Sequence, residues 1–197
     1  EHPGHIDADH PVEGGRIPYT ADAAAQRAEN KANWLERDPL AKCYMPGVPR
    51  ATYLPQPFQI TQERGSLLLA YEFAGATRIV YMNQPVLPAQ VDSWMGHNLG
   101  RWDGETLVVD VTAQVADTWF DSAGNFHGPT MHVQERYTPA GPDLLLYEAT
   151  ITHPEGAEND RLARAGFAAK RRQARTDGQV QGLDQHNVAD PKADQHA

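Results

Sequence analysis

A succession of short strand-like segments between residues 58 and 153 constrains the fold of this chain most. The segments are rich in β-branched, aromatic and leucine residues, and turn sequences such as Asp103-Gly104 separate them. The predicted strands are 58–62, 66–73, 77–82, 94–102, 106–112, 130–138 and 144–153. Short strands at hairpin spacing favour an antiparallel meander. The sequence therefore predicts a mainly β protein whose meander curls into a barrel.

A helix and a proline-rich segment precede these strands. Residues 21–37 contain many alanines and other good helix formers. Thr20 is a suitable N-cap, and Asp38-Pro39 ends the helix because a residue before proline avoids helical geometry. Residues 43–58 then combine prolines with large apolar side chains. Since proline excludes a central strand or helix, we expect an extended apolar strap lying across the core.

The two ends of the chain differ in composition from this domain. Residues 1–20 lack apolar periodicity, which indicates an arm. After residue 153 a weak apolar periodicity over 158–175 predicts a helix, and the polar sequence from residue 176 predicts an extended or disordered tail. The predicted organisation is an N-terminal arm (1–20), a domain of helix, strap and barrel (21–153), and a C-terminal helix with a polar tail (154–197).

Charge and composition exclude several classes of protein. The net charge of −9 argues against nucleic acid or an anionic membrane as the main partner. No apolar run approaches the roughly 20 residues that span a bilayer, so we expect no membrane span. Cys43 is the single cysteine, which excludes an intrachain disulfide, and we expect its thiol to be buried or half-buried. The first residue is Glu, which we interpret as the processed N-terminus of a periplasmic or extracellular protein, or as a trimmed chain.

Candidate functional residues gather between residues 92 and 137, where three of the four tryptophans and three of the nine histidines lie. A histidine beside a carboxylate can perform acid–base chemistry near neutral pH. We therefore consider His97, His127 or His132 as a catalytic base, with Asp110 or Glu135 orienting it. Alternation along the strand places Glu135 on an apolar face, where a carboxylate needs a partner or a raised pKa. The alternative is that these groups only bond across strands or to loop backbone.

The same region supplies candidate ligand-binding residues. The predicted set is Trp94, Arg101, Trp102, Trp119 and Arg136. Arginines can bind an anionic ligand through two hydrogen bonds, although they more often pair with nearby acidic groups. Glycines beside the tryptophans of strand 94–102 suggest indole rings lying over bare backbone. The cofactor, if there is one, is unknown, with zinc or copper as candidates.

A metal site is a further hypothesis. His127 and His132 are five residues apart, and His97 would join them across the sheet. Three imidazoles suit zinc or copper, but the spacing matches no tight metal motif. His2 and His5 at the N-terminus are more typical of a solvated arm.

Long sequence motifs give the chain a resemblance to a known family. They include D-P-L-A-K-C-Y-M-P-G-V-P-R-A-T-Y, S-W-M-G-H, G-R-W-D-G-E-T-L-V-V-D-V-T, W-F-D-S-A-G-N-F-H and H-V-Q-E-R-Y. Between about residues 15 and 153, the chain resembles exported, largely uncharacterised bacterial proteins. The resemblance implies export and a lipocalin-like β-barrel, but no activity. After residue 153 the sequence departs from the family, which usually continues with an aromatic segment ending in P-W.

Three functional hypotheses follow. In the first, a lipocalin-like barrel binds a small, partly aromatic or sugar-like ligand and acts on it through a histidine–carboxylate pair. In the second, the chain is a structural subunit whose terminal arms reach onto neighbouring copies, giving a homo-oligomer. In the third, His97, His127 and His132 bind a metal. The sequence alone leaves open whether the protein is an enzyme.

Overall fold

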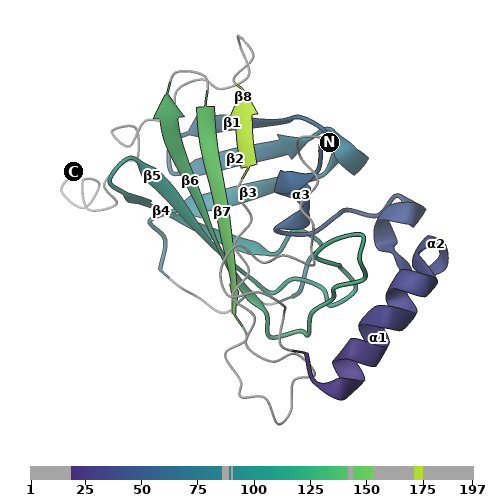
Figure 1. Cartoon of the computed structure of the whole chain (residues 1–197). Helices are drawn as coiled ribbons and strands as arrows, with labels where there is room; N and C mark the ends of the chain where they lie inside the picture. Colours follow the sequence, from purple (N-terminus) through teal and green to yellow (C-terminus); the bar gives the residue numbers. More distant parts are fainter. Residues whose placement is uncertain (1–18, 86–88, 90, 142–143, 153–170, 175–197) are drawn as a thin grey trace, which may run out of the picture.

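The structure of the chain is a computed structural model, and it describes residues 19–85, 89, 91–141, 144–152 and the backbone of 171–174. A single sheet dominates the described residues (Figure 1). Its strands are β1 (Phe58–Glu63), β2 (Ser66–Tyr71), β3 (Thr77–Met82), β4 (His97–Asp103), β5 (Thr106–Thr112), β6 (His132–Gly141), β7 (Leu144–Thr152) and β8 (Arg171–Ala174). The helices are α1 (Ala21–Ala32), α2 (Trp34–Arg37), η1 (Pro39–Lys42), α3 (Arg50–Tyr53) and η2 (Phe73–Gly75).

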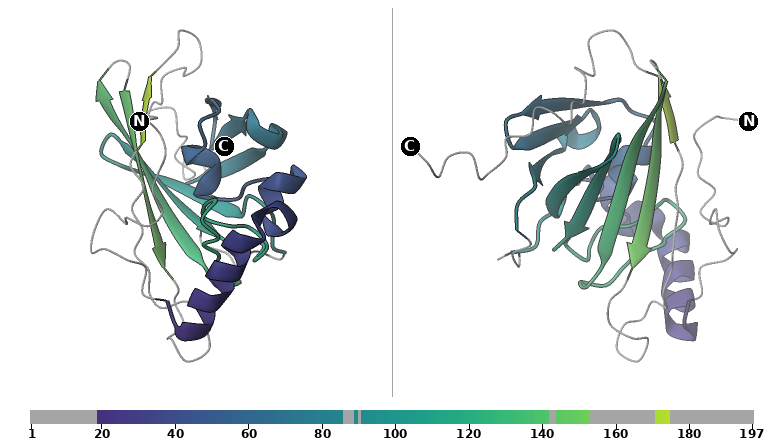
Figure 2. Two further views of the ribbon diagram at one scale, coloured as in Figure 1. Left: turned by 45° about the vertical axis from the view of Figure 1, so that its right-hand side comes forward. Right: turned by 90° about the vertical axis from the view of Figure 1, so that its left-hand side faces the viewer.

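The sheet curls into a half-barrel. The strands follow one another in sequence order from β1 to β8, and β1–β3 lie across β6–β8 at a large angle (Figures 1 and 2). The mainly β, lipocalin-like architecture predicted from the sequence is thus confirmed. Among the described residues, each of the two edge strands, β1 and β8, pairs with one neighbour only.

One strand pairing differs from the predicted meander. β3 and β4 are parallel, and they pair only through Val80–Met82 and Asn98–Gly100, whereas all other neighbours are antiparallel. A parallel pair needs a long connection that carries the chain back to the starting end. Residues 83–96 provide that connection. They include the turn at Gly96, which is why β4 begins at His97 rather than at residue 94.

The other strands and the first helix lie close to their predicted positions. The helix predicted over 21–37 is divided at Asn33 into α1 and α2, with Thr20 as its N-cap. The prediction of a helix over 158–175 is wrong at residues 171–174, because these residues form strand β8 and pair with β7. The remainder of that helix, the arm up to residue 18, the N-terminal histidines and the tail from residue 175 lie outside the described residues. Within the described part of the chain, no helix is long and apolar enough to cross a membrane.

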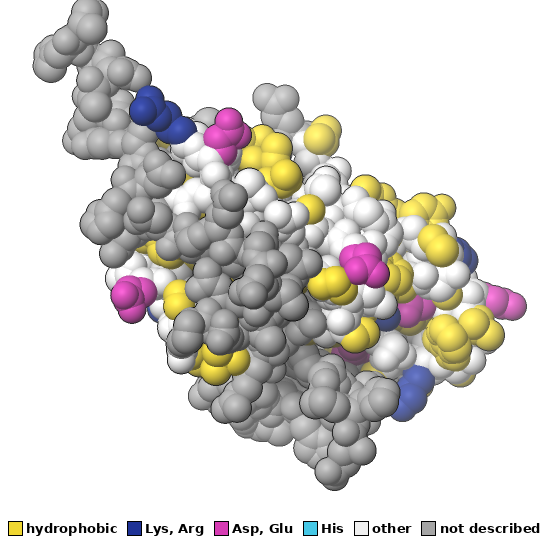
Figure 3. Space-filling view, turned by 90° about the horizontal axis from the view of Figure 1, so that it is seen from above, with side chains coloured by type: hydrophobic (Ala, Val, Ile, Leu, Met, Phe, Trp, Pro, Cys, Tyr) yellow, Lys and Arg dark blue, Asp and Glu magenta, His cyan; other side chains and the backbone are white. Residues whose placement is uncertain are grey.

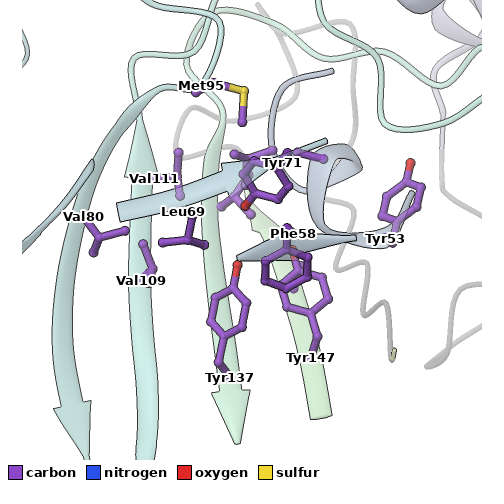
Figure 4. Close-up of a cluster of buried hydrophobic side chains, with 14 of the residues drawn as sticks. Tyr53, Phe58, Leu69, Tyr71, Val80, Met95, Val109, Val111, Tyr137 and Tyr147 are labelled. Atoms are coloured by element: carbon purple, nitrogen blue, oxygen red, sulfur yellow. The ribbon is translucent and has the colours of Figure 1, made fainter. Parts of the chain in front are cut away.

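The core fills the concave side of the sheet, and side chains from strands far apart in the sequence meet there (Figure 4). Gly100 of β4 also faces this side. A side chain there would not fit, because its Cβ atom would be 2.5 Å from the sulfur of Met82 and 2.6 Å from Val80. The predicted packing of indole rings over the glycines is therefore wrong at this position. A methionine of the parallel neighbour β3 occupies the space.

The proline-rich segment crosses the core as predicted, but it contains one turn of helix, α3, whose residues are all buried. Gln114 fixes this segment by accepting from the Val48 amide at 2.9 Å and donating to its carbonyl at 3.0 Å. Gly47 has a positive φ of 71° and lies so close to Thr118 that a side chain would not fit. Cys43, by contrast, is exposed. The prediction of a buried thiol is wrong because the chain turns outward after η1.

A buried ion pair joins strands β3 and β6 across the interior of the curled sheet. Arg78 of β3 donates to both carboxylate oxygens of Glu135 on β6, at 2.6 and 3.1 Å. Tyr137 and Tyr147 donate to the same carboxylate at 3.0 and 2.8 Å, and burial raises the pKa of both phenols, which keeps them protonated. Thr52 of α3 also contacts Glu135, at 3.4 Å. The prediction that this carboxylate needs a partner is confirmed.

Glu135→Gln should destabilise the protein strongly, because it keeps the shape of the side chain and leaves the Arg78 charge buried without a counter-charge. Breaking a buried pair in this way costs about 3–5 kcal/mol. The measurement is the free energy of unfolding from urea denaturation. The control is Asp103→Asn, which removes an exposed partner of Arg136 and should cost less than about 1 kcal/mol. A loss below about 1 kcal/mol for Glu135→Gln would contradict the assigned role.

Candidate functional site

The outer face of the sheet carries a row of side chains set by the strand register. Tyr81 of β3 lies beside Leu99 of β4, Leu99 lies opposite Asp110 of β5, and Asp110 lies opposite Gln134 of β6. Alternation along each strand explains the placement, because residues two apart share a face. On β5, Leu107, Val109 and Val111 belong to the core, and Asp110 points outward. The outer face therefore changes from apolar to polar across β3, β4 and β5.

Two predicted site residues, His132 and Arg101, meet at a third, Asp110, together with Gln134. One carboxylate oxygen, Oδ1, lies 3.1 Å from Nε2 of His132 and accepts from Nε2 of Gln134 at 3.0 Å. The other oxygen, Oδ2, accepts from Arg101 of β4. Neighbouring strands β4, β5 and β6 supply these groups, and regular strand pairing fixes their relative positions. The arrangement is a histidine–carboxylate pair supported by an amide and a guanidinium.

Asp110 carries the negative charge of this cluster. Burial alone would raise its pKa, but hydrogen bonds from Gln134 and Arg101 and the charges of Arg101 and His132 lower the pKa below its ordinary value. An ionised carboxylate accepts only, so a neutral His132 must donate from Nε2 and keep its lone pair on Nδ1. Nδ1 lies 3.3 Å from the hydroxyl oxygen of Thr152. The ring is thereby held in one tautomer with a basic nitrogen.

A pocket of about 500 Å³ opens beside this cluster. Its lining residues are Asn83, Gln84, Leu99, Gly100, Arg101, Asp110, Thr112 and His132. Asn83 and Gln84 follow β3, and the amide of Asn83 donates to the carbonyl of Gly100 at 2.9 Å. Leu99 and Gly100 supply an apolar floor, and amide, hydroxyl, carboxylate, guanidinium and imidazole groups surround it. Polar and charged side chains outnumber apolar ones in this lining, so the pocket is suited to a ligand that makes several hydrogen bonds.

The other predicted catalytic residues lie elsewhere. Glu135 is fully buried in the ion pair with Arg78. His127 is buried, with Nε2 2.6 Å from the Thr118 hydroxyl and Nδ1 2.8 Å from the Gly128 carbonyl. These contacts stabilise the loop that contains His127 and hold the imidazole of His127 away from the pocket. His97 lies on the outer face beside Tyr81, where it lines a separate depression of about 350 Å³.

The predicted ligand-binding residues are also divided. Arg101 lines the pocket, whereas Arg136 pairs with Asp103 at 2.8 Å. Trp94 stacks on Tyr44, with ring centroids 5.0 Å apart. Trp102 packs against the core, and the buried Trp119 lines a groove between helix α1 and the loop 116–126. The tryptophans therefore do not line a common ligand site.

The predicted metal site is not formed by the described residues. Within them, no group of three or more histidine, cysteine, aspartate or glutamate side chains could hold a metal ion. His127 is held inside a loop, and His97 and His132 contact different partners on the outer face. The hypothesis of a shared zinc or copper centre at His97, His127 and His132 is therefore wrong.

The predicted set lacked Gln134, which donates to Asp110, and the pocket residues Asn83 and Gln84. Gln134 shares the face of His132 by strand alternation, and that periodicity was the signal that could have found it. Asn83 and Gln84 reach the pocket only because β3 pairs in parallel with β4. No local pattern in the sequence indicates that pairing. Scans against protein-family models, curated proteins and solved structures found no match for this chain.

Asp110→Asn should lower stability by about 1 kcal/mol at pH 7, the upper range for partly exposed ion pairs. Because the folded-state pKa of Asp110 is depressed, the stabilisation is present above the ordinary value of 3.8 and is lost as pH falls through the lower folded-state pKa. The difference between wild type and variant should be present at about pH 5 and shrink as the pH falls below 3.8. Urea denaturation from about pH 5 to about pH 2 measures it, and a difference that persists at the acid end would refute the assigned charge.

Proposed function

We propose that this chain binds a small hydroxylated, sugar-like molecule in the outer-face pocket and that His132 exchanges a proton with it. The observation that carries the proposal is the convergence of Arg101, Asp110 and His132 on one pocket through hydrogen bonds. Export to the periplasm or the cell exterior is part of the proposal, and it rests on the family resemblance alone.

The pocket offers both donors and acceptors, as a polyhydroxylated ligand requires. Each hydroxyl can donate one hydrogen bond and accept two. Among the described residues Arg101 is bonded to Asp110 alone, so the other N–H groups of its guanidinium can donate to a ligand. The side-chain amides of Asn83 and Gln84 offer one donor and one acceptor group each. Leu99 and Gly100 give the apolar surface on which the C–H face of a sugar ring would lie.

His132 is the residue of the pocket suited to proton transfer near neutral pH. A ligand hydroxyl that takes the place of Thr152 at Nδ1 would donate a hydrogen bond to that nitrogen, pass its proton to it and take a proton back, so that no alkoxide remains. While the proton is on Nδ1, the ionised Asp110 at Nε2 stabilises the imidazolium. Asp110 is then a positioning residue, because it fixes the tautomer and supports the positive charge without receiving the proton.

Isothermal titration with methyl β-D-glucopyranoside and related methyl glycosides tests the binding. At least one glycoside should bind the wild type, and Asp110→Asn should weaken that binding at least tenfold, or about 1.4 kcal/mol. The matched control is Asp103→Asn, which removes an exposed carboxylate of the same sheet outside the pocket and should leave binding unchanged. The proposal fails if no glycoside binds, or if both variants bind as the wild type does.

A further inference from the structure

We infer that the ligand of the outer-face pocket is amphipathic, with an unbranched alkyl chain attached to its polar head. The chain would lie along an apolar stripe formed by Leu68, Ile79, Tyr81 and Leu99. This inference rests on the proposed function, because it assigns the head group to the pocket at Asp110.

The strand register makes the stripe continuous with the pocket. Leu99 is a floor residue of the pocket and lies beside Tyr81. Ile79 lies two residues before Tyr81 on the same face of β3, and Leu68 of β2 lies opposite Ile79. Neighbouring strands are about 4.8 Å apart and residues two apart on a strand are about 6.7 Å apart, so the straight path from Leu99 to Leu68 is roughly 12 Å long. An octyl chain has a length of that order.

The side chains of the stripe are exposed enough to contact another molecule. The exposed fractions of Leu68, Ile79 and Tyr81 are 42%, 46% and 43%. A single exposed apolar residue is ordinary, but a contiguous set beside a polar site is typical of a binding surface. Exposed hydrophobic side chains also gather in separate groups over the described surface seen from above (Figure 3).

The outer face has a polar part on β5 and β6 and an apolar part on β2 and β3, and together these two parts define the class of ligand. On β5 and β6 the outer face presents Asp110 and Gln134, while the stripe on β2 and β3 has no charged member. A purely polar ligand would leave the stripe in water, and a purely apolar one would bury Asp110 and Arg101 without replacing their hydrogen bonds to water, which is costly. An alkyl glycoside, with hydroxyls at one end and methylenes at the other, satisfies both parts.

Comparison of two glycosides with the same head tests the inference. The probes are methyl β-D-glucopyranoside and n-octyl β-D-glucopyranoside, the latter kept below the concentration at which it forms micelles. Isothermal titration of the full chain should give a Kd at least tenfold lower for the octyl compound. The double variant Leu68→Ser/Ile79→Ser should remove this advantage and leave binding of the methyl compound unchanged. The control is Leu35→Ser on α2, a residue that is 65% exposed and remote in sequence from the stripe.

The outcomes separate the two proposals. Equal affinity for both glycosides would overturn the alkyl chain and leave the pocket intact. An octyl advantage that survives in Leu68→Ser/Ile79→Ser would place the chain elsewhere and would also overturn the inference. Binding of neither glycoside would refute the glycoside pocket itself, and the alkyl chain with it. Light scattering that shows a wild-type dimer, and a monomer for the double variant, would instead identify a second copy of the chain as the occupant of the stripe.

Discussion

The ion pair between Arg78 and Glu135 is the interaction on which the rest of the structure depends. It joins β3 to β6 through the interior of the half-barrel, and two tyrosines and Thr52 of α3 complete its hydrogen bonds. A buried charge is tolerated only when its partner and its hydrogen bonds are in place. The curvature of the sheet and the position of the strap are therefore fixed together by one polar centre inside an apolar core.

Much of the fold followed from local sequence. Alternation and turn residues located seven strands, and the mainly β half-barrel confirms that prediction. The requirement that Glu135 have a partner followed from its place on an apolar face, but the identity of Arg78 did not. These two residues are 57 positions apart, and their meeting depends on how the sheet curls. Likewise, β8 replaced the end of a predicted helix because pairing with β7 outweighs a weak local preference.

The candidate site was predictable in part. Asp110, His132 and Arg101 were singled out for their chemistry, and regular antiparallel pairing between β4, β5 and β6 brings them together. His127 and Glu135 have the same kinds of side chain as His132 and Asp110 but are buried in contacts of their own. Composition cannot distinguish the two situations, because burial is decided by tertiary packing. Asn83 and Gln84 belong to the site because β3 pairs in parallel with β4, and no short-range sequence pattern predicts that pairing.

The short parallel contact between β3 and β4 divides the sheet into two blocks, each made of antiparallel neighbours. Strands β1–β3 and β4–β8 can each form from nearby segments, whereas the seam between them requires closure of the long connection 83–96. The outer-face pocket lies on this seam, with Asn83 and Gln84 from one side and Asp110 and His132 from the other. A molecule bound there touches both blocks, so its binding energy would also hold the sheet together.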